Sequence, residues 1–185
     1  AMETTTLINQ RLSVSQVPEA VAKLIPEKSD GNPFFAEQLA YTLRDSGLLD
    51  TSSGHVVLKG GVEDLQRLDV PDTIQGVITS RIDRLPPAQQ LTLKVASVIG
   101  TTFPVRAVFD VYPIASDRGQ LRDHLSELVK LELIEQVTPE PDVSYSFIHT
   151  TTQDVAYNLM LQTQRRDLHE SVARWYERNF VYDLS

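Results

Sequence analysis

The chain has 185 residues, of which 41% are hydrophobic and 23% are charged, and its formal net charge is −8. This length is enough to bury one sizeable core or two small ones. The acidic balance argues against general nucleic-acid binding, which depends on neutralising phosphates, and the absence of cysteine excludes disulfides, thiolate metal sites and cysteine nucleophiles.

Targeting signals are missing from the sequence. No apolar run reaches the roughly 18 residues of a membrane span, and residues 1–6 lack the basic and apolar regions of a signal peptide. We therefore expect a cytoplasmic protein without a membrane partner, which the lack of cysteine also fits. Ala1 and Met2 are typical of a cloning scar, so we interpret the chain as a piece of a longer protein.

The first third of the chain predicts helices. Short apolar patterns indicate helices over 6–12 and 18–25, the second with proline in its first turn, where the missing N–H costs nothing. The turn-forming sequence SDGNP at 29–33 follows. A third helix then runs to Gly47, a natural C-terminal stop. Its apolar residues at helical spacing are Phe34, Phe35, Leu39 and Leu43.

The middle of the chain contains a weakly patterned stretch and then another helix. Residues 50–69 fit either a short hairpin or a mobile loop. Helical spacing returns over 74–85, and Asp72 is suited to cap this helix, with Gln75 three residues further on. The two prolines at 86–87 then break the chain, which indicates a boundary between two subdomains.

After the prolines the pattern is three helices followed by a β-hairpin, which is the order of a winged helix. Apolar residues cover most of the circumference of the first of these helices, so we expect it at the centre of a core. Two further helices close the chain. The expected helices lie at 90–99, at 104–111 and from Ser116 or Asp117 onward, and the strands at 133–137 and 143–148.

Residues 144–160 (SYSFIHTTTQDVAYNLM) predict a strand that turns directly into a helix. Aromatic residues alternate with serines, as one face of a sheet requires, and Thr151 with Asp154 offers a helix cap. His149 stands at the junction, where its imidazole would lie beside the N–H groups of a helix start, which favour anions. The alternative is a histidine that caps the helix or packs under the helical subdomain that precedes the two prolines.

The sequence carries no motif of a self-sufficient enzyme. The dipeptide Gly-Lys does not occur, so there is no phosphate-binding G-x-x-x-x-G-K-[ST] loop, and there is no G-x-S-x-G elbow. The histidines lack metal-ligand spacing. They are His55, His124, His149 and His169. We expect no catalytic residue, no metal and no bound cofactor in this chain.

Several phrases, in order, resemble the STAND class of signal-transduction ATPases. The similarity covers nearly the whole chain, from about Leu7 to Tyr176. It is closest to large bacterial proteins that join a class III adenylate/guanylate cyclase domain to such an ATPase, and to their predicted-ATPase and transcription-regulator relatives. The phrases are GNPFFAEQL (31–39), RDSGLL (44–49), VPDTIQ (70–75), SRIDRLP (80–86), KVASVIGTTF (94–103), FIHTTTQDVAY (147–157) and RRDLH (165–169).

The resemblance implies an AAA-like P-loop domain upstream, then a small helical lid, a winged helix and often helical repeats. The chain would be mostly α with a small β-hairpin. A helical lid subdomain at 5–85 would precede a winged-helix subdomain at 86–162. A C-terminal helix over 163–185 would lead toward the repeats. The parent protein would bind ATP or ADP. The expected partners are the upstream P-loop domain of the same chain and downstream helical repeats or a protein partner.

The resemblance also implies two groups of nucleotide-binding residues. A lid turn that packs on adenine maps onto Gly31, Asn32 and Pro33, where glycine lets the backbone approach a flat ring and proline offers a rigid apolar face; the alternative is a helix-start turn that needs no ligand. His149 matches the position where related switches place a histidine near the β-phosphate of ADP. In this hypothesis ADP pins the winged helix to the P-loop domain, and exchange for ATP frees it and alters an output such as a cyclase.

Other interpretations compete with the nucleotide switch. Arg81 and Arg84 are candidates for phosphate contact or for pairing across the junction of lid and winged helix, but a solvated or salt-bridged helix face is the favoured alternative. Winged helices commonly bind DNA, but the candidate recognition helix at 117–130 has three basic and three acidic residues, and the wing tip at 138–142 has two acids and no lysine or arginine. We therefore expect no nucleic-acid partner. A transcription regulator's DNA-binding or protein-interaction domain, or a passive scaffold between the ATPase and helical repeats, remain alternatives.

Overall fold

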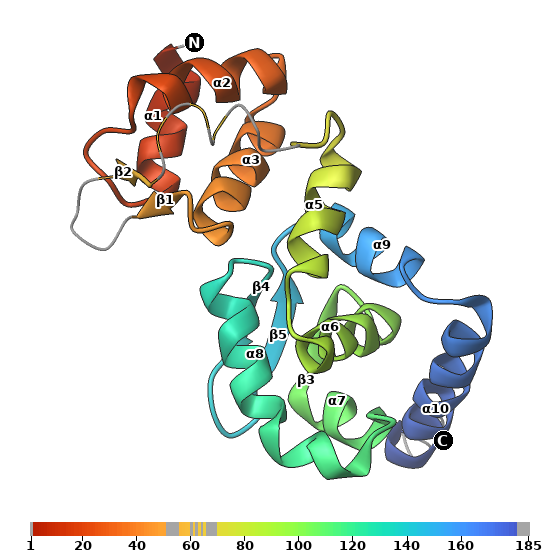
Figure 1. Ribbon diagram of the computed structural model, residues 1–185. Coiled ribbons are helices and arrows are strands. Elements are labelled where there is room, and N and C mark those ends of the chain that lie inside the picture. The colour runs from red at the N-terminus through yellow and green to blue at the C-terminus, as the bar shows by residue number, and fades with distance from the viewer. Residues whose placement is uncertain are drawn as a thin grey trace. The chain divides into compact units, whose positions relative to one another are not determined.

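The computed structural model describes residues 2–50, 56–59, 61, 63, 65 and 70–180. The chain is mostly α-helical with a small β component (Figure 1). It forms two compact units, unit 1 (Ala1–Arg81) and unit 2 (Ile82–Ser185), which divide inside the helix α5 (Ile74–Asp83) rather than at the prolines 86–87. No helix in the described ranges is both long and apolar enough to cross a membrane.

Unit 1 is built around one buried helix. Helices α1 (Met2–Arg11) and α2 (Glu19–Ser29) both pack on α3 (Pro33–Asp45), and every residue of α3 from Phe35 to Leu43 is buried. Strands β1 (Leu49–Asp50) and β2 (Val57–Leu58) pair antiparallel, with Leu49 opposite Leu58. Within 50–69, Asp50, Val57 and Leu58 belong to this hairpin, which is one of the two structures that the sequence allowed, whereas Gly61, Glu63 and Leu65 are helical, which the sequence did not predict. His55 lies outside the described residues.

The residue that caps helix α5 differs from the one that the sequence predicts. Helix α5 is capped by Thr73, whose Oγ1 accepts a hydrogen bond from Gly76 N at 3.1 Å, and not by Asp72. The Asp72 carboxylate instead accepts a hydrogen bond from Lys28 Nζ at 2.7 Å, and Lys28 Nζ also donates to Val70 O at 3.1 Å. A lysine distant in sequence thus engages the carboxylate that sequence reasoning assigned to the cap.

The first complete helix of unit 2 is α6 (Pro87–Ile99), the expected central helix. It packs against α7 (Val105–Val111), α8 (Leu121–Lys130), α9 (Thr150–Asn158) and α10 (Gln162–Phe180). The helix expected from Ser116 or Asp117 starts as a 3₁₀-helix, η1 (Ala115–Gln120), and becomes α-helical only at Leu121. On its inner face, Leu121, Leu125 and Leu128 are fully buried.

The sheet of unit 2 has three strands where the sequence predicted two. Strands β4 (Ile134–Thr138) and β5 (Ser144–Phe147) form the expected hairpin, and β3 (Thr102–Pro104) pairs antiparallel with the other edge of β5. Phe103 lies opposite Tyr145 in this register. The element order α6, β3, α7, α8, β4, β5 and the strand order β3-β5-β4 are those of a winged helix (Figure 1).

Candidate functional site

Residues 31–33 form the turn that joins α2 to α3. The chain leaves α2 through Asp30 and Gly31, whose φ values are +47° and +76°. Asn32 then caps α3, because its Oδ1 accepts a hydrogen bond from Phe35 N at 3.1 Å. Pro33 occupies the first helical turn, where its missing N–H costs nothing. The helix start alone accounts for Asn32 and Pro33.

The same turn is accessible to a ligand. Gly31, Asn32 and Pro33 are all exposed, and a Cβ added at Gly31 would meet no atom within 4 Å. A flat ring can therefore approach this backbone, whereas any larger residue at position 31 would be strained by the positive φ. The adenine-packing role of the three residues stays a prediction.

His149 lies where β5 passes into α9. It is the N-cap residue of α9, with extended backbone angles φ −130° and ψ 133°, and its carbonyl accepts a hydrogen bond from Thr152 N at 3.0 Å. The imidazole is half-buried, and its Nε2 atom is shielded from solvent. The strand-to-helix corner that the sequence predicts is present, with the histidine at the corner itself.

The side chain that anchors this corner is not the predicted one. Thr151 lies inside the first turn of α9 rather than at its cap, and Asp154 is exposed, so the Thr151 cap was wrong. Gln153 holds the helix start instead: its Nε2 donates to Ser97 O at 3.1 Å, and its Oε1 accepts from Thr101 Oγ1 at 2.8 Å. These two bonds tie α9 to the end of α6 and to the segment before β3, which fixes the position of His149.

The start of α9 is suited to an anion. Its first turn contains threonines and no acidic residue. The first N–H groups of a helix have no partner within the helix, and the helix dipole adds partial positive charge there. A phosphate or carboxylate oxygen can accept hydrogen bonds from such N–H groups, with the imidazole of His149 beside them. The helix start therefore fits an anion, whereas Nε2 of His149 is shielded from solvent and would have to become exposed to contact one.

Arg81 has a different environment from the one that a phosphate contact requires. Its side chain is 1% exposed, and Nε donates to Asp45 Oδ2 at 3.0 Å while Nη1 donates to Gln38 Oε1 at 2.6 Å. Its guanidinium also lies 5.0 Å from the ring centroid of Tyr41. Burial lowers the pKa of Arg81, and the charge of Asp45 opposes that effect. Arg81 thus belongs to a buried network, which is the salt-bridged alternative.

The network extends along α3. Arg44 Nε contacts the second oxygen of Asp45 at 3.0 Å, and its guanidinium lies 4.8 Å from the Tyr41 ring. Tyr41 donates through its hydroxyl to Glu37 Oε1 at 3.1 Å, and Arg11 contacts the same oxygen at 2.8 Å. These contacts pair the polar side chains of a helix that is buried all round. Arg84, one turn after Arg81, is exposed.

The surface of unit 2 that DNA-binding winged helices use is neutralised by internal ion pairs. Arg122 on α8 contacts the wing residue Glu140 at 2.8 Å, which raises the pKa of Arg122. Arg106 on α7 lies 3.6 Å from the wing residue Asp142. Lys130 contacts Glu127 at 2.5 Å within α8. The acids of the wing tip thus lie directly against the cations that would otherwise face a phosphate backbone.

The remaining described histidines have structural partners. His124 is buried in unit 2, with Nδ1 3.2 Å from Thr92 Oγ1. His169 Nε2 lies 3.0 Å from the hydroxyl of Tyr157. Within the described ranges, no group of three or more histidine or acidic side chains is arranged to hold a metal ion.

One comparison with known proteins concerns the start of unit 1. The model of a family described as "Domain of unknown function (DUF8739)" matches residues 1–56. These residues contain α1, α2, α3 and β1, and therefore the 31–33 turn. No match was found among curated proteins. The family description carries no information about a ligand or a partner.

Proposed function

We propose that the chain is the lid and winged-helix part of a STAND-class signal-transduction ATPase and acts as its regulatory nucleotide switch. An upstream P-loop domain of the parent holds ADP or ATP, and the parent, not this chain, hydrolyses the nucleotide. The 31–33 turn packs on the adenine, and the winged helix closes toward the phosphates through His149. Exchange of ADP for ATP releases the winged helix and changes an output such as a cyclase.

The observation that carries this proposal is the position of His149. It lies at the end of the central strand of the sheet and at the anion-favouring start of α9, and Gln153 fixes that helix start through two hydrogen bonds. A binding residue needs this kind of support, because a group that is already oriented loses little freedom when its ligand arrives. An imidazole can donate a hydrogen bond to a phosphate oxygen near neutral pH.

Replacing His149 with alanine should weaken ADP binding by the parent protein roughly tenfold to a hundredfold. The basis is that a hydrogen bond to a charged group contributes about 1.5–3 kcal/mol. Isothermal titration calorimetry with ADP measures the affinity, and small-angle scattering with and without ADP measures the compaction. His169→Ala is the matched control, because His169 is an exposed histidine on α10 and should leave both quantities unchanged. Equal affinity and equal compaction in wild type and His149→Ala would reject the role of His149.

The DNA-binding alternative makes a separate prediction. We expect the 185-residue chain to show no salt-sensitive retention of duplex DNA at low salt, because Arg106, Arg122 and Lys130 face carboxylates. A variant with Glu140→Lys and Asp142→Lys should gain such retention if wing acidity is the reason. Clear salt-sensitive binding by the unmodified chain would instead favour a transcription-regulator domain.

A further inference from the structure

Two hollows in unit 2 join along one side of α10. The first has a volume of about 250 Å³ and the second about 520 Å³, and both are lined by Val111 and Ser171. The lining positions on α10 run from Gln164 to Asn179 and recur three or four residues apart, which places them on one helix face. We call the joined hollows the α10 groove.

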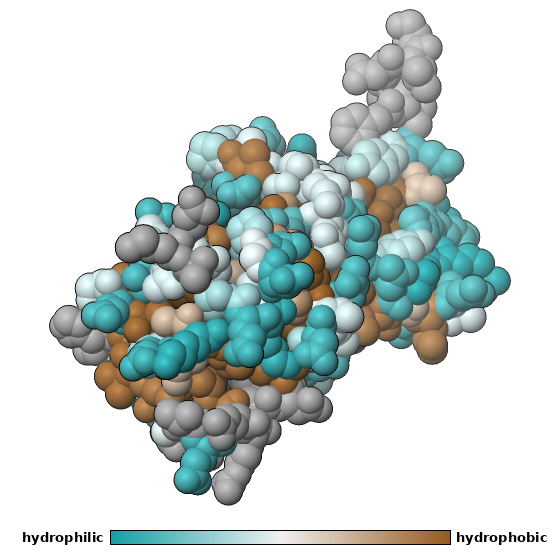
Figure 2. Space-filling model, turned by 90° about the horizontal axis from the view of Figure 1, so that it is seen from above, coloured by the Kyte–Doolittle hydropathy of each residue, from teal (hydrophilic) through white to brown (hydrophobic). Residues whose placement is uncertain are grey.

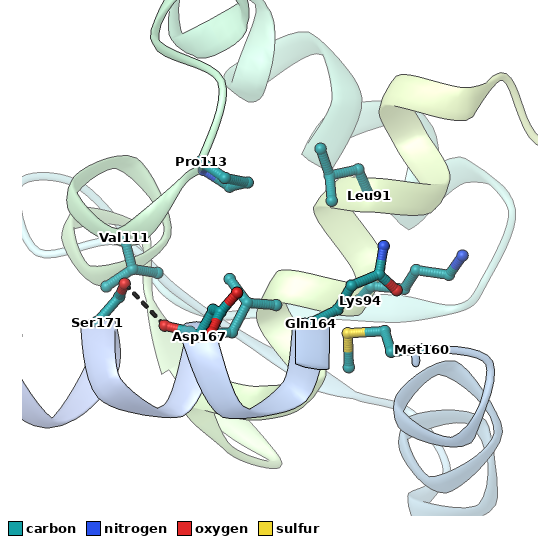
Figure 3. A pocket seen from close by; sticks show the side chains of 9 residues that line it. Leu91, Lys94, Val111, Pro113, Met160, Gln164, Asp167 and Ser171 are labelled. Atoms are coloured by element: carbon teal, nitrogen blue, oxygen red, sulfur yellow. Dashed lines mark hydrogen bonds between the residues drawn. The ribbon is translucent and has the colours of Figure 1, made fainter. Parts of the chain in front are cut away.

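One end of the α10 groove is apolar. Its apolar walls are Leu91 of α6, Val111 of α7, Pro113, Met160 and Leu168 of α10, and the charged residues Lys94 and Asp167, of opposite sign, also line it. Figure 3 shows α10 along one side of this hollow, with Pro113 and Leu91 facing it from across the opening. Two further apolar residues, Ile114 and Leu161, directly follow lining residues in sequence and are 42% and 68% exposed.

Exposed apolar residues occur elsewhere on the molecule too: on the face drawn in Figure 2, hydrophobic residues reach the surface at several places among hydrophilic ones. Single exposed apolar residues need no explanation, but a concave apolar pocket with exposed apolar residues beside it is a feature of binding sites.

The other end of the groove is basic. Arg118, Arg174 and Arg178 line it, although the chain as a whole has a net charge of −8. Arg118 donates to Tyr112 O at 3.1 Å, Arg174 pairs with Glu170, and Arg178 donates through Nε to Arg174 O at 3.2 Å. Within the described residues, Arg178 has no ion pair.

The acidic groups at the groove leave this end positive. The Asp110 carboxylate accepts the indole N–H of Trp175 at 2.8 Å, which directs one of its oxygens at α10. Asp167 lines the apolar end and lies 3.6 Å from Arg166. Three arginines against Asp110 and the Glu170 partner of Arg174 therefore give the basic end a net positive charge.

The length of the groove indicates what binds there. Gln164 to Asn179 spans about 22 Å at 1.5 Å per residue, roughly four helical turns. We propose that the α10 groove binds an acidic amphipathic helix of a protein partner, with its apolar side chains in the Met160 end and its carboxylates at Arg174 and Arg178. The charge separation along the groove matches such a segment, and helix-in-groove binding uses apolar anchors of this kind. The inference does not depend on the nucleotide switch.

A designed peptide tests this proposal on the complete 185-residue chain. The probe is a fluorescently labelled, fifteen-residue helical peptide with two leucines one turn apart near one end and four glutamates near the other, made in both sequence orders. Fluorescence anisotropy gives its Kd. We expect saturable binding that Arg178→Glu weakens by roughly tenfold or more. Ser171→Phe, which blocks the junction of the two hollows, should have a similar effect.

Matched controls separate the groove from general charge attraction. Arg106→Glu makes the same charge change on an exposed arginine of unit 2 that lines neither hollow, and it should alter the Kd less than twofold. A peptide with lysines in place of the glutamates should not bind. Absence of binding by both acidic peptides, or an equal effect of Arg106→Glu and Arg178→Glu, would overturn the proposal. If dodecyl phosphate binds and neither peptide does, the proposal is overturned and the groove binds a small amphiphile instead. If neither peptide binds but the chain self-associates, and Arg178→Glu abolishes that self-association, the proposal is overturned and the groove binds a second copy of the chain.

Discussion

Replacing Arg81 with leucine should lower the free energy of unfolding of unit 1 by about 3 kcal/mol. Removing one partner of a buried ion pair costs about 3–5 kcal/mol, because the other charge stays buried without compensation. Here the remaining group is Asp45, whose side chain is 12% exposed. Arg44 still contacts its other oxygen at 3.0 Å, so we expect the lower end of the range.

The measurement and its control follow from where the residues lie. The single tryptophan, Trp175, belongs to unit 2, so urea unfolding of unit 1 is best followed by far-UV circular dichroism. Arg84→Ala removes an exposed arginine from the end of the same segment and should change stability by less than about 0.5 kcal/mol. An Arg81→Leu variant as stable as wild type, or an Arg84→Ala variant equally destabilised, would contradict the buried-pair account.

A double replacement tests the physical cause directly. If the cost of Arg81→Leu comes from the Asp45 carboxylate that is left without Arg81, then adding Asp45→Leu should restore part of the lost stability, since apolar replacement of a buried pair is often neutral. The recovery is only partial because Arg44 then loses its contact with Asp45. If the cost comes only from lost packing on Tyr41, the two replacements should add. The sign of the coupling therefore distinguishes the electrostatic from the packing contribution of Arg81.

The burial of Arg81 can be predicted from the sequence, but its partner cannot. Arg81 follows Val77 by four residues and Ile78 by three, so helical spacing places it on the apolar face of α5. A charge at such a position indicates a buried partner. The partner itself, Asp45, lies 36 residues earlier on a different helix. No local pattern connects the two, because their contact depends on how α3 and α5 pack.

The candidate site shows the same division between local and long-range information. The 31–33 turn follows from glycine, asparagine and proline chemistry, and the corner at His149 follows from the change of period between strand and helix. The anchor of that corner was missed because Gln153 reaches Ser97, 56 residues earlier in sequence. Strand β3 was missed for a related reason: it has three residues, ends in proline and gains its partner only through β5.

The second prediction with a large effect on stability concerns Phe103 in strand β3. Replacing Phe103 with alanine should destabilise unit 2 by about 3–5 kcal/mol, the usual cost of deleting a buried phenylalanine side chain. Phe103 is fully buried, and its ring centroid lies 5.7 Å from that of Phe147 and 6.2 Å from that of Tyr145. Trp175 fluorescence during urea unfolding reports on unit 2. Thr102→Ala, an exposed neighbour on the same strand, should cost less than about 1 kcal/mol.

A conservative variant distinguishes volume from specific packing. Phe103→Leu keeps an apolar side chain in the same space, and we expect it to cost less than half as much as Phe103→Ala. If both variants are equally destabilised, the aromatic contacts with Tyr145 and Phe147 matter more than the filled volume. Both rings lie on β5, the strand that leads to His149. In the nucleotide-switch proposal, Phe103→Ala should therefore also weaken ADP binding by the parent, because a loosened β5 no longer holds the histidine in place, whereas Phe103→Leu should retain it.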